Sequence, residues 1–334
     1  MEMFRFTKAA DVPQAVQAGA QAKTAQQGAQ VRFIAGGTTL LDLMKLNVER
    51  PAVVVDINRL PLDKVEKLPN GGLKIGALVR NSDLAHDPIV QRDYSVLSQA
   101  LLSGASAQLR NMATTGGNLL QRTRCVYFRN DAMACNKREP GSGCSAIEGE
   151  NRTMAILGGS KDCIATNPSD MNVALTALEA VVHIQGAKGE RDVPIGEFFV
   201  VPGSTPQREN MLEPGDLITY VTLPPPKTNT KQVYLKLRDR ASYEFALSSS
   251  AIVIEVSGGK IAYIRVALGG VGTKPWRSHE AENALLGKPV DAVMFHRAAE
   301  AAMHEARPQS QNAYKIELAK RCIKHALTLA TATA

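Results

Sequence analysis

Four of the five cysteines of this 334-residue chain lie in one stretch, with the spacing C-x9-C-x8-C-x18-C at Cys125, Cys135, Cys144 and Cys163. Iron–sulfur clusters require thiolate ligands of this kind. Zinc accepts the same ligands, but structural zinc sites usually contain short C-x2–4-C pairs, and the sequence has none here. The spacing therefore favours an iron–sulfur cluster, while zinc, disulfides and free thiols remain as alternatives.

The residues between these cysteines offer little for a hydrophobic core. They are rich in Gly, Asn, Arg and Glu, as in Gly141-Ser142-Gly143 and Glu148-Gly149-Glu150-Asn151. We therefore expect a bound metal centre to order this segment. The fifth cysteine, Cys322, lies on a C-terminal helical pattern and is expected to be a free, buried thiol.

Two glycine-bearing segments have the composition of ligand-binding loops. In Ile34-Ala35-Gly36-Gly37-Thr38-Thr39-Leu40 a buried strand runs into paired glycines, hydroxyls and a helix start, and Thr114-Thr115-Gly116-Gly117-Asn118-Leu119 has the same character. Glycines permit close approach of the backbone to a ligand, and amides at a helix start bind phosphate oxygens. An ordinary strand-to-helix turn is the alternative. Neither a G-x-G-x-x-G nor a Walker sequence occurs, which disfavours a nicotinamide Rossmann domain or a P-loop NTPase.

The stretch from Arg110 to Asp170 connects these features. It opens with the second glycine segment and closes with Ala165-Thr166-Asn167-Pro168-Ser169-Asp170, so the cysteine-bearing excursion is expected to hold two polar, turn-like ends apart. Our interpretation is a flavin site at the two ends and an iron–sulfur cluster in the excursion.

No acid–base machinery accompanies these loops. The histidines are scattered, and none is spaced with a carboxylate or a serine as in a catalytic motif; they are His86, His183, His279, His296, His304 and His325. We expect them to be solvated or structural and assign no catalytic residue. The chemistry of an enzyme of this kind would reside in a cofactor.

The composition bounds the class of protein. Hydrophobic residues at 44% and charged residues at 21% are ordinary for a soluble globular protein, and the length suggests two or three domains. The formal charge is +7, but the basic residues are spread and aromatics are only 5%, which disfavours nucleic-acid binding. No apolar run approaches the ~20 residues that span a bilayer. The segment Met1 to Phe6 lacks the pattern of a secretory signal, so export is expected only alongside a partner.

The hydrophobic pattern predicts the elements that position these loops. Residues 1–60 are predicted to form a small α/β unit. Predicted helices cover 11–27, 38–45, 94–109 and 170–178, and predicted strands cover 31–35, 51–57, 73–77, 180–184, 193–195 and 217–223. The proline run 224–226 and the polar residues 227–231 indicate a domain boundary. Beyond it, the pattern predicts strands at 232–237, 251–256 and 260–268, a hairpin turn at 257–260, and helices near 278–286, 290–306 and 312–329.

Taken together, these segments resemble the flavin-binding subunit of the molybdenum hydroxylases, the family of xanthine dehydrogenase and carbon monoxide dehydrogenase. The resemblance covers essentially the whole chain. Its anchors are the two glycine segments, Ser169-Asp170, Leu223-Pro224, Tyr234-Leu235-Lys236 and Ala267-Leu268-Gly269-Gly270. Together they are specific, although each alone is weak.

The resemblance implies an α+β fold with a two-part FAD-binding domain of the vanillyl-alcohol-oxidase (PCMH) type and a C-terminal α+β domain of the CO-dehydrogenase flavoprotein type. We expect FAD subdomains at 1–60 and 61–224, a cysteine-bearing insertion at about 119–165, and the C-terminal domain at 232–330. Residues 34–40 match the loop that wraps the FAD pyrophosphate. The positions that match FAD contacts are Ile34, Ala35, Gly36, Gly37, Thr38, Thr39, Leu40, Gly104, Thr114, Gly117, Asn118, Asp170, Ile218 and Lys236.

The chain departs from most of this family after Asn118, where the Ser-Asp pair usually follows within about ten residues. Here the interval is far longer and contains the four clustered cysteines. The flavin subunits of 4-hydroxybenzoyl-CoA reductase and of bacterial periplasmic aldehyde oxidoreductase are similar in carrying a [4Fe–4S] cluster in such an insertion, and the latter is the more similar. The resemblance thus implies that Cys125, Cys135, Cys144 and Cys163 are the cluster ligands.

The resemblance also implies partners. A molybdenum-cofactor subunit would oxidise an aldehyde or a related substrate, and a [2Fe–2S] subunit would pass electrons to the FAD of this chain and on to an external acceptor, in a heterotrimer. The most similar subunits imply the periplasm, reached by co-export, and the cytoplasm is the alternative. A free-standing flavin oxidase and a zinc-organised scaffold remain as rival functions.

Overall fold

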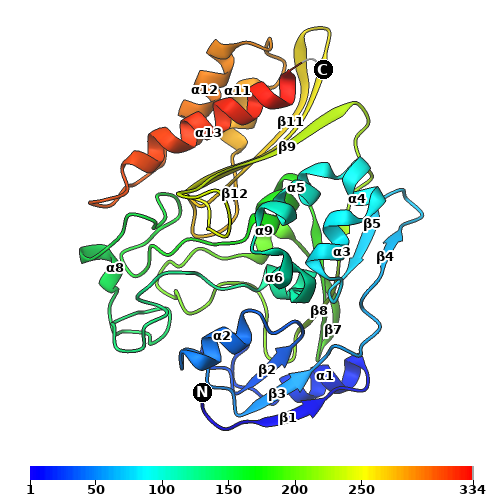
Figure 1. The fold of residues 1–334 in the computed structure, drawn as a ribbon, viewed down its shortest axis with the longest axis vertical. Helices are drawn as coiled ribbons and strands as arrows, with labels where there is room; N and C mark the ends of the chain where they lie inside the picture. The colour runs from blue at the N-terminus through cyan, green and yellow to red at the C-terminus, as the bar shows by residue number, and fades with distance from the viewer. Residues whose placement is uncertain (333–334) are drawn as a thin grey trace.

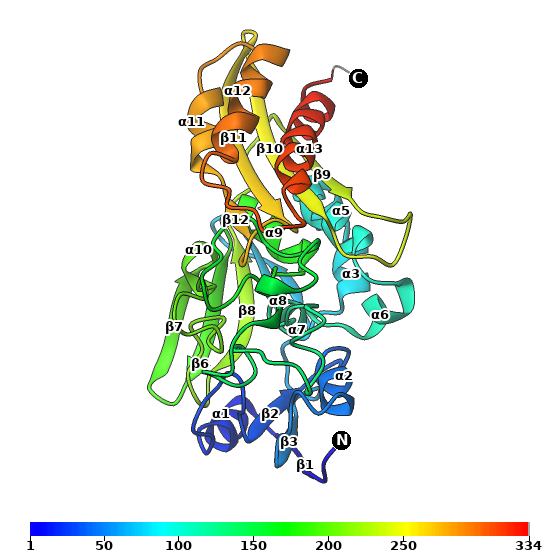
Figure 2. The ribbon, with the colours of Figure 1, turned by 90° about the vertical axis from the view of Figure 1, so that its left-hand side faces the viewer.

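The computed structural model describes residues 1–332, and in this part of the chain three β-sheets follow one another along the long axis of the molecule (Figure 1). The N-terminal sheet lies at one end and the C-terminal helices lie at the other. A green, largely irregular segment projects to one side between them, and Figure 2 shows it from the front. No helix within 1–332 is long and apolar enough to cross a membrane.

The first sheet is parallel, with the order β1-β3-β2, and its two α-helices are the crossover connections that parallel strands require. Its elements are β1 (Arg5–Lys8), α1 (Val12–Gly19), β2 (Val31–Ile34), α2 (Leu40–Lys45) and β3 (Val53–Asp56). This small α/β unit was predicted from the sequence. Strand β1 was not, because its residues alternate poorly between apolar and polar.

Helix α1 is shorter than predicted. The Asp11 side chain accepts a hydrogen bond from the amide of Gln14, as expected for its cap, but the helix ends at Gly19 rather than near Gln27. The guanidinium group of Arg32 donates to the carbonyl oxygens of Ala25 and Gln26, both at 2.7 Å. These bonds stabilise a turn over residues that the sequence pattern had assigned to the helix.

The middle sheet is antiparallel, with the order β4-β5-β8-β6-β7, and its helices bury a large apolar core against it. Its strands are β4 (Val65–Lys67), β5 (Leu73–Gly76), β6 (Val181–Gly186), β7 (Gly189–Pro194) and β8 (Leu217–Leu223). Its helices are α3 (Asn81–His86), α4 (Pro88–Asp93), α5 (Ser95–Ser103), α6 (Ala107–Met112), α7 (Thr115–Leu119), α9 (Asp170–Ala177) and α10 (Ile195–Phe198).

Strand β8 has the predicted bounds, whereas the single helix predicted at 94–109 is wrong. Two helices, α5 and α6, replace it, because the chain turns at Gly104 and Ala105, where Ala105 has a φ of 52°. Every residue of α9 is buried, which explains why this helix showed small apolar residues rather than an amphipathic pattern.

The C-terminal sheet has the order β12-β11-β10-β9, with three helices on one face. Its elements are β9 (Thr230–Leu237), β10 (Ser248–Ser257), β11 (Lys260–Gly269), β12 (Trp276–Arg277), α11 (His279–Leu285), α12 (Ala292–Ala302) and α13 (Tyr314–Thr331). The predicted hairpin is confirmed, since Ser257 pairs with Lys260. Cys322 is a free, fully buried thiol on α13, as predicted, and burial raises its pKa to about 11.

The cysteine segment, residues 119–165, contains a single short helix beyond α7, α8 (Ser145–Glu148), within the described chain. It nevertheless has a small apolar core, in which Phe128 and Met154 pack with three of the cysteines and with Leu43 and Val48 of the first subdomain. The expectation that this segment buries little is therefore wrong. Two buried aliphatic residues of this core, Leu43 and Val48, come from another part of the chain, which the local composition does not reveal.

Candidate functional site

The first glycine segment is shaped by contacts that only glycine permits. Gly37 has a φ of +73°, and a Cβ atom at Gly36 would lie 1.8 Å from the carbonyl oxygen of Met112. The turn between β2 and α2 therefore packs directly against the end of α6. Among the described residues, the backbone N–H groups of residues 36–39 donate to no acceptor, so a row of amides is available to an anionic ligand.

The second glycine segment forms the short helix α7. The Thr114 hydroxyl caps it by accepting from the amide of Gly117 at 3.2 Å, and Gly116 donates to the carbonyl oxygen of Ala77 at 2.8 Å. The Asn118 Oδ1 atom accepts from the Ser169 hydroxyl at 2.7 Å. The two polar ends of the stretch 110–170 are thus in contact, and the expectation that the excursion holds them apart is wrong.

A buried ion pair lies where the middle and C-terminal sheets meet. The Asp170 carboxylate accepts from Lys236 Nζ at 2.8 Å and from the Tyr234 hydroxyl at 2.5 Å, and the side chains of Asp170 and Lys236 are 9% and 4% exposed. Burial and the neighbouring Asp170 charge raise the pKa of Tyr234 well above its usual value. Lys236 also donates to the carbonyl oxygen of Ser103, beside Gly104.

These loops border a cleft with two adjoining parts, of about 1190 and 1040 Å³. Thr38, Thr39 and Gly117 line both parts. The first part is lined by Ile34, Ala35, Gly36, Gly37, Leu40, Thr114 and Ile218, and the second by Gly104, Asn118, Asp170 and Lys236. The structure therefore brings all the residues expected to contact FAD together around one continuous cleft.

Several residues of the second part of the cleft were not predicted. Asn81 is buried with an Oδ1 atom that has no partner among the described residues, and the same is true of Arg110 Nε. Tyr243, with a φ of 52°, and Phe245 lie at the exposed edge of the cleft. The sequence assigned Asn81 no part in the site. Its burial beside the cleft depends on tertiary contacts, and no local signal indicates it.

The four clustered cysteines come together in the core of the cysteine segment. Cys125, Cys135 and Cys163 are buried, Cys144 packs against them, and Cys135 and Cys144 are partners in an antiparallel bridge. All are free thiols. Burial raises the pKa of Cys125 to about 12 and also raises that of Cys163. Without a bound cation Cys125 and Cys163 are thus held as neutral thiols.

The arrangement of these thiols does not match a single metal ion. Within residues 1–332, no three His, Cys, Asp or Glu side chains are placed so that together they would hold one ion. A tetrahedral zinc site requires its ligands to converge on one point. In an iron–sulfur cluster each thiolate binds a different iron, so the ligands surround a larger body.

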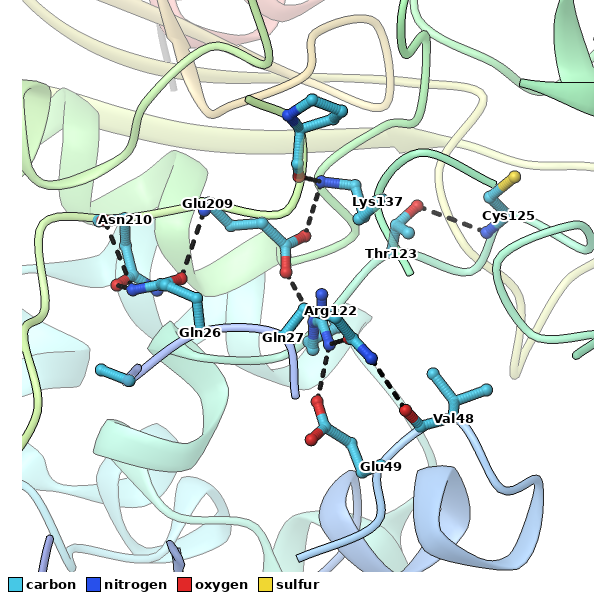
Figure 3. A network of polar contacts seen from close by, with 12 residues as sticks. Gln26, Gln27, Val48, Glu49, Arg122, Thr123, Cys125, Lys137, Glu209 and Asn210 are labelled. Atoms are coloured by element: carbon cyan, nitrogen blue, oxygen red, sulfur yellow. Dashed lines mark hydrogen bonds and ion pairs between the residues drawn. The ribbon is translucent and has the colours of Figure 1, made fainter. Parts of the chain in front are cut away.

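A buried network of charges joins the cysteine segment to the first subdomain (Figure 3). Arg122 forms ion pairs with Glu49 at 2.6 Å and with Glu209 at 2.5 Å, and Lys137 pairs with Glu209 at 3.0 Å. Burial alone would raise the pKa of Glu209, but the charges of Arg122 and Lys137 outweigh it and lower this pKa to about 2. Arg32 completes the network by binding Glu49.

The fold and the cleft define a class of flavoprotein subunit. The family described as "FAD binding domain in molybdopterin dehydrogenase" matches residues 2–226, and the "CO dehydrogenase flavoprotein C-terminal domain" matches residues 233–330. The chain belongs to the family of FAD-binding medium subunits of molybdenum hydroxylases.

Known proteins support this assignment over the full length. The chain is 52% identical to the aldehyde oxidoreductase FAD-binding subunit PaoB of Escherichia coli K12, over 94% of this chain and 95% of that protein. It is 30% identical to the glyceraldehyde dehydrogenase medium chain of Sulfolobus acidocaldarius, over 84% and 82%. Its fold is similar to that of a chain of carbon monoxide dehydrogenase from Hydrogenophaga pseudoflava, with a TM-score of 0.77 and 27% identity over 98% and 97% of the two chains.

Proposed function

We propose that this chain is the FAD and [4Fe–4S] electron-transfer subunit of a molybdenum-dependent aldehyde oxidoreductase complex. One observation carries the proposal: a cleft with unpartnered polar groups lies beside a core in which four free thiols are gathered. The 52% identity to a subunit named for aldehyde oxidation supports the choice of substrate class.

The residues around the cleft fit FAD. The unpartnered amides of residues 36–39 would hold the pyrophosphate, and Gly36 and Gly37 permit the tight turn that presents these amides to the cleft. The unpartnered Asn81 Oδ1 and Arg110 Nε are buried groups that a bound molecule would satisfy in the second part of the cleft. Gly104, Asn118, Asp170 and Lys236 would complete that part, whereas Thr114 and Ile218 line the first part and Gly117 lines both.

The cysteine site fits a cluster better than it fits zinc. Cys125, Cys135, Cys144 and Cys163 would be its ligands. The backbone amides of Tyr127 and Phe128 beside Cys125, and that of Ala165 beside Cys163, lower the pKa of these thiols against the larger effect of burial. Hydrogen bonds to ligand sulfurs stabilise thiolates and tune the potential of a cluster. The C-x9-C-x8-C-x18-C spacing, without the short C-x2–4-C pairs of structural zinc sites, supports this choice.

The chain's own residues bind and relay rather than activate a substrate. All six histidines are described, and none lines either part of the cleft. Bound FAD supplies redox chemistry that accepts and releases electrons. A [2Fe–2S] subunit would deliver these electrons from a molybdenum subunit that oxidises the aldehyde, in a heterotrimer, and an external acceptor would remove them. We further propose that the complex is periplasmic and reaches this compartment by co-export with a partner, in line with the resemblance of the sequence to periplasmic aldehyde oxidoreductases.

Anaerobic mixing with aldehydes tests the relay function. We expect the purified chain to keep its flavin absorbance unchanged when an aldehyde is added, because it offers no group that activates the substrate. Adding the molybdenum and [2Fe–2S] subunits should then allow the aldehyde to bleach the flavin. Rapid bleaching in the chain alone would contradict the relay and favour a free-standing flavin oxidase.

A further inference from the structure

Arg122 occupies a position between the two proposed cofactor sites. It lies three residues before Cys125 in the sequence, and its side chain is only 10% exposed. Its guanidinium group binds Glu49, Glu209 and the Gln27 side chain (Figure 3). Glu49 and Gln27 belong to the first FAD subdomain, so Arg122 is a direct link from the cysteine segment to that subdomain.

One side of Arg122 faces the FAD cleft. Arg122 and Glu49 both line the first part of the cleft, together with the glycine loop. The Glu49 side chain is 2% exposed, and its two basic partners are Arg32 and Arg122. This wall of the cleft is therefore complete only when Arg122 is in place.

The other side of Arg122 contacts the cysteine core. Its guanidinium carbon lies 4.5 Å from the centre of the Phe128 ring, and Phe128 packs among Cys125, Cys135 and Cys163. Leu43 bridges the same two regions, because it belongs to the cysteine core and also lines the cleft. An ordered cysteine core thus fixes the surface on which Arg122 rests.

Because the charges of Arg122 and Glu49 are buried, their contact depends on whether the cysteine segment is ordered. Buried charges are tolerated when they are paired, and removal of one partner leaves the others uncompensated. If the cysteine segment loosens, Arg122 withdraws from Glu49 at the cleft wall. Whatever orders the segment therefore also orders the wall, and coupling of this kind is reciprocal between two ligands.

We propose that Arg122 is a positioning residue that couples the two cofactor sites, so that a cluster bound by the cysteines tightens the binding of FAD. This inference rests on the proposed cluster and adds a residue and a direction of coupling to it. By the same linkage, bound FAD makes the cluster harder to remove.

The test compares FAD affinity with and without the cluster in the full chain. Wild-type protein is stripped of FAD, one half is treated with an oxidant and a chelator to remove iron, and FAD is titrated into both halves by quenching of flavin fluorescence. We expect the dissociation constant to be ~10-fold higher in the iron-free half. Reconstitution with iron and sulfide should restore the original affinity in the same sample.

Variants distinguish a specific role of Arg122 from a general effect of the contacts between the cysteine segment and the first subdomain. In Arg122→Gln the ratio of the two dissociation constants should fall close to one, and in Arg122→Lys, which keeps a charge for Glu49, it should be intermediate. Arg129→Gln is the matched control. Arg129 lies in the same segment and pairs with Asp42 of the first subdomain at 2.7 Å, but it lines neither part of the cleft. This variant should keep the wild-type ratio.

The outcomes distinguish this inference from the function on which it rests. Suppose that assays find iron and sulfide in one wild-type half and none in the other, and that both halves bind FAD equally well. This result would overturn the coupling but not the assignment of the cluster. If the ratio of the two dissociation constants fell close to one in Arg129→Gln as well as in Arg122→Gln, the coupling would belong to the segment as a whole. That result would overturn the role of Arg122. Wild-type protein that takes up no iron would overturn both.

Discussion

The FAD cleft and the cysteine segment lie side by side but are built in different ways. The cleft is bordered by the ends of strands and helices, such as the turn from β2 into α2, and backbone hydrogen bonds hold these elements. The cysteine segment has hardly any regular structure. Backbone hydrogen bonds of irregular turns and side-chain contacts hold it instead, for example Arg138, which donates to the carbonyl oxygens of Tyr127 and Phe128.

This difference implies different dependence on bound cofactors. A cleft framed by sheets and helices keeps its shape without a ligand, because the stability of the frame comes from the core of the sheets. A segment that gathers four thiols in its core depends on what binds those thiols. We therefore expect loss of FAD to leave the fold intact, and loss of the metal to loosen the cysteine segment.

The largest effect is expected from loss of a clustered cysteine. Single Cys→Ser changes at Cys125, Cys135, Cys144 or Cys163 should abolish bound iron and acid-labile sulfide and reduce the yield of soluble protein, because the segment loses the centre that orders it. Iron and sulfide assays measure this. Cys322→Ser is the control, since Cys322 lies on α13 away from the segment, and it should retain both. Iron lost with Cys322 and kept without Cys163 would reverse the ligand assignment.

A substitution among the residues that border the cleft should instead lower the free energy of unfolding. Lys236→Met leaves the buried Asp170 carboxylate without its cation and should lower the free energy of unfolding by about 3–5 kcal/mol. Urea unfolding of the flavin-free chain measures this. The exposed pair of Glu317 and Arg321 on α13 provides the control, because Arg321→Met removes a solvent-screened contact and should change the free energy of unfolding far less. Equal costs at the two sites would show that the Asp170 pair is not buried in solution.

A smaller effect is expected at the glycine loop. Gly37→Val places a branched side chain at a φ of +73° and should cost about 1–2 kcal/mol, and it should also reduce the FAD content by blocking the approach of the pyrophosphate. Gly28→Val is the matched control, because Gly28 has a φ of +77° and open space around an added Cβ atom. It should show the same loss of stability with normal FAD content. Normal FAD content in both variants would remove the loop from the site.

The smallest effect is expected at Lys315, which contacts the cysteine segment and should make the free energy of unfolding depend on pH. Lys315 Nζ is buried and donates to the carbonyl oxygens of Thr153, Met154 and Gly270. Burial lowers its pKa to about 7, from 10.5. Between these values the unfolded chain binds more protons than the folded one, so stability rises with pH.

The expected rise is about 1 kcal/mol between roughly pH 7 and pH 8. Below about pH 7 this group contributes no slope, since Lys315 is protonated in both states. Lys315→Met should abolish the difference between the two pH values in urea unfolding. A slope that persists unchanged in this variant would assign the pH dependence to another group.

The same two regions also differ in how far the sequence reveals them. Residues 34–40 were predicted from a local pattern of strand, glycine, hydroxyl and helix, and the pairing of Ser257 with Lys260 followed from a turn signal. Asp170 and Lys236 were predicted to share a site only through resemblance to a family, because 66 positions separate them.

The contacts around Arg122 were not predicted by either route. The residues that meet there, Glu49, Arg122 and Glu209, lie far apart in the chain, and charged residues without periodicity give no sign of their partners. For the same reason the end of α1 at Gly19 was missed, since the Arg32 contacts that favour a turn there are tertiary.

The composition of the purified full chain tests the central claim most directly. Iron, acid-labile sulfide, zinc and FAD are assayed on one sample, together with its visible absorption spectrum. We predict flavin bands over a broad iron–sulfur absorbance, with ~4 iron and ~4 sulfide per FAD and no zinc. Flavin bands alone, or zinc in place of iron and sulfide, would contradict the account of a subunit that holds both cofactors.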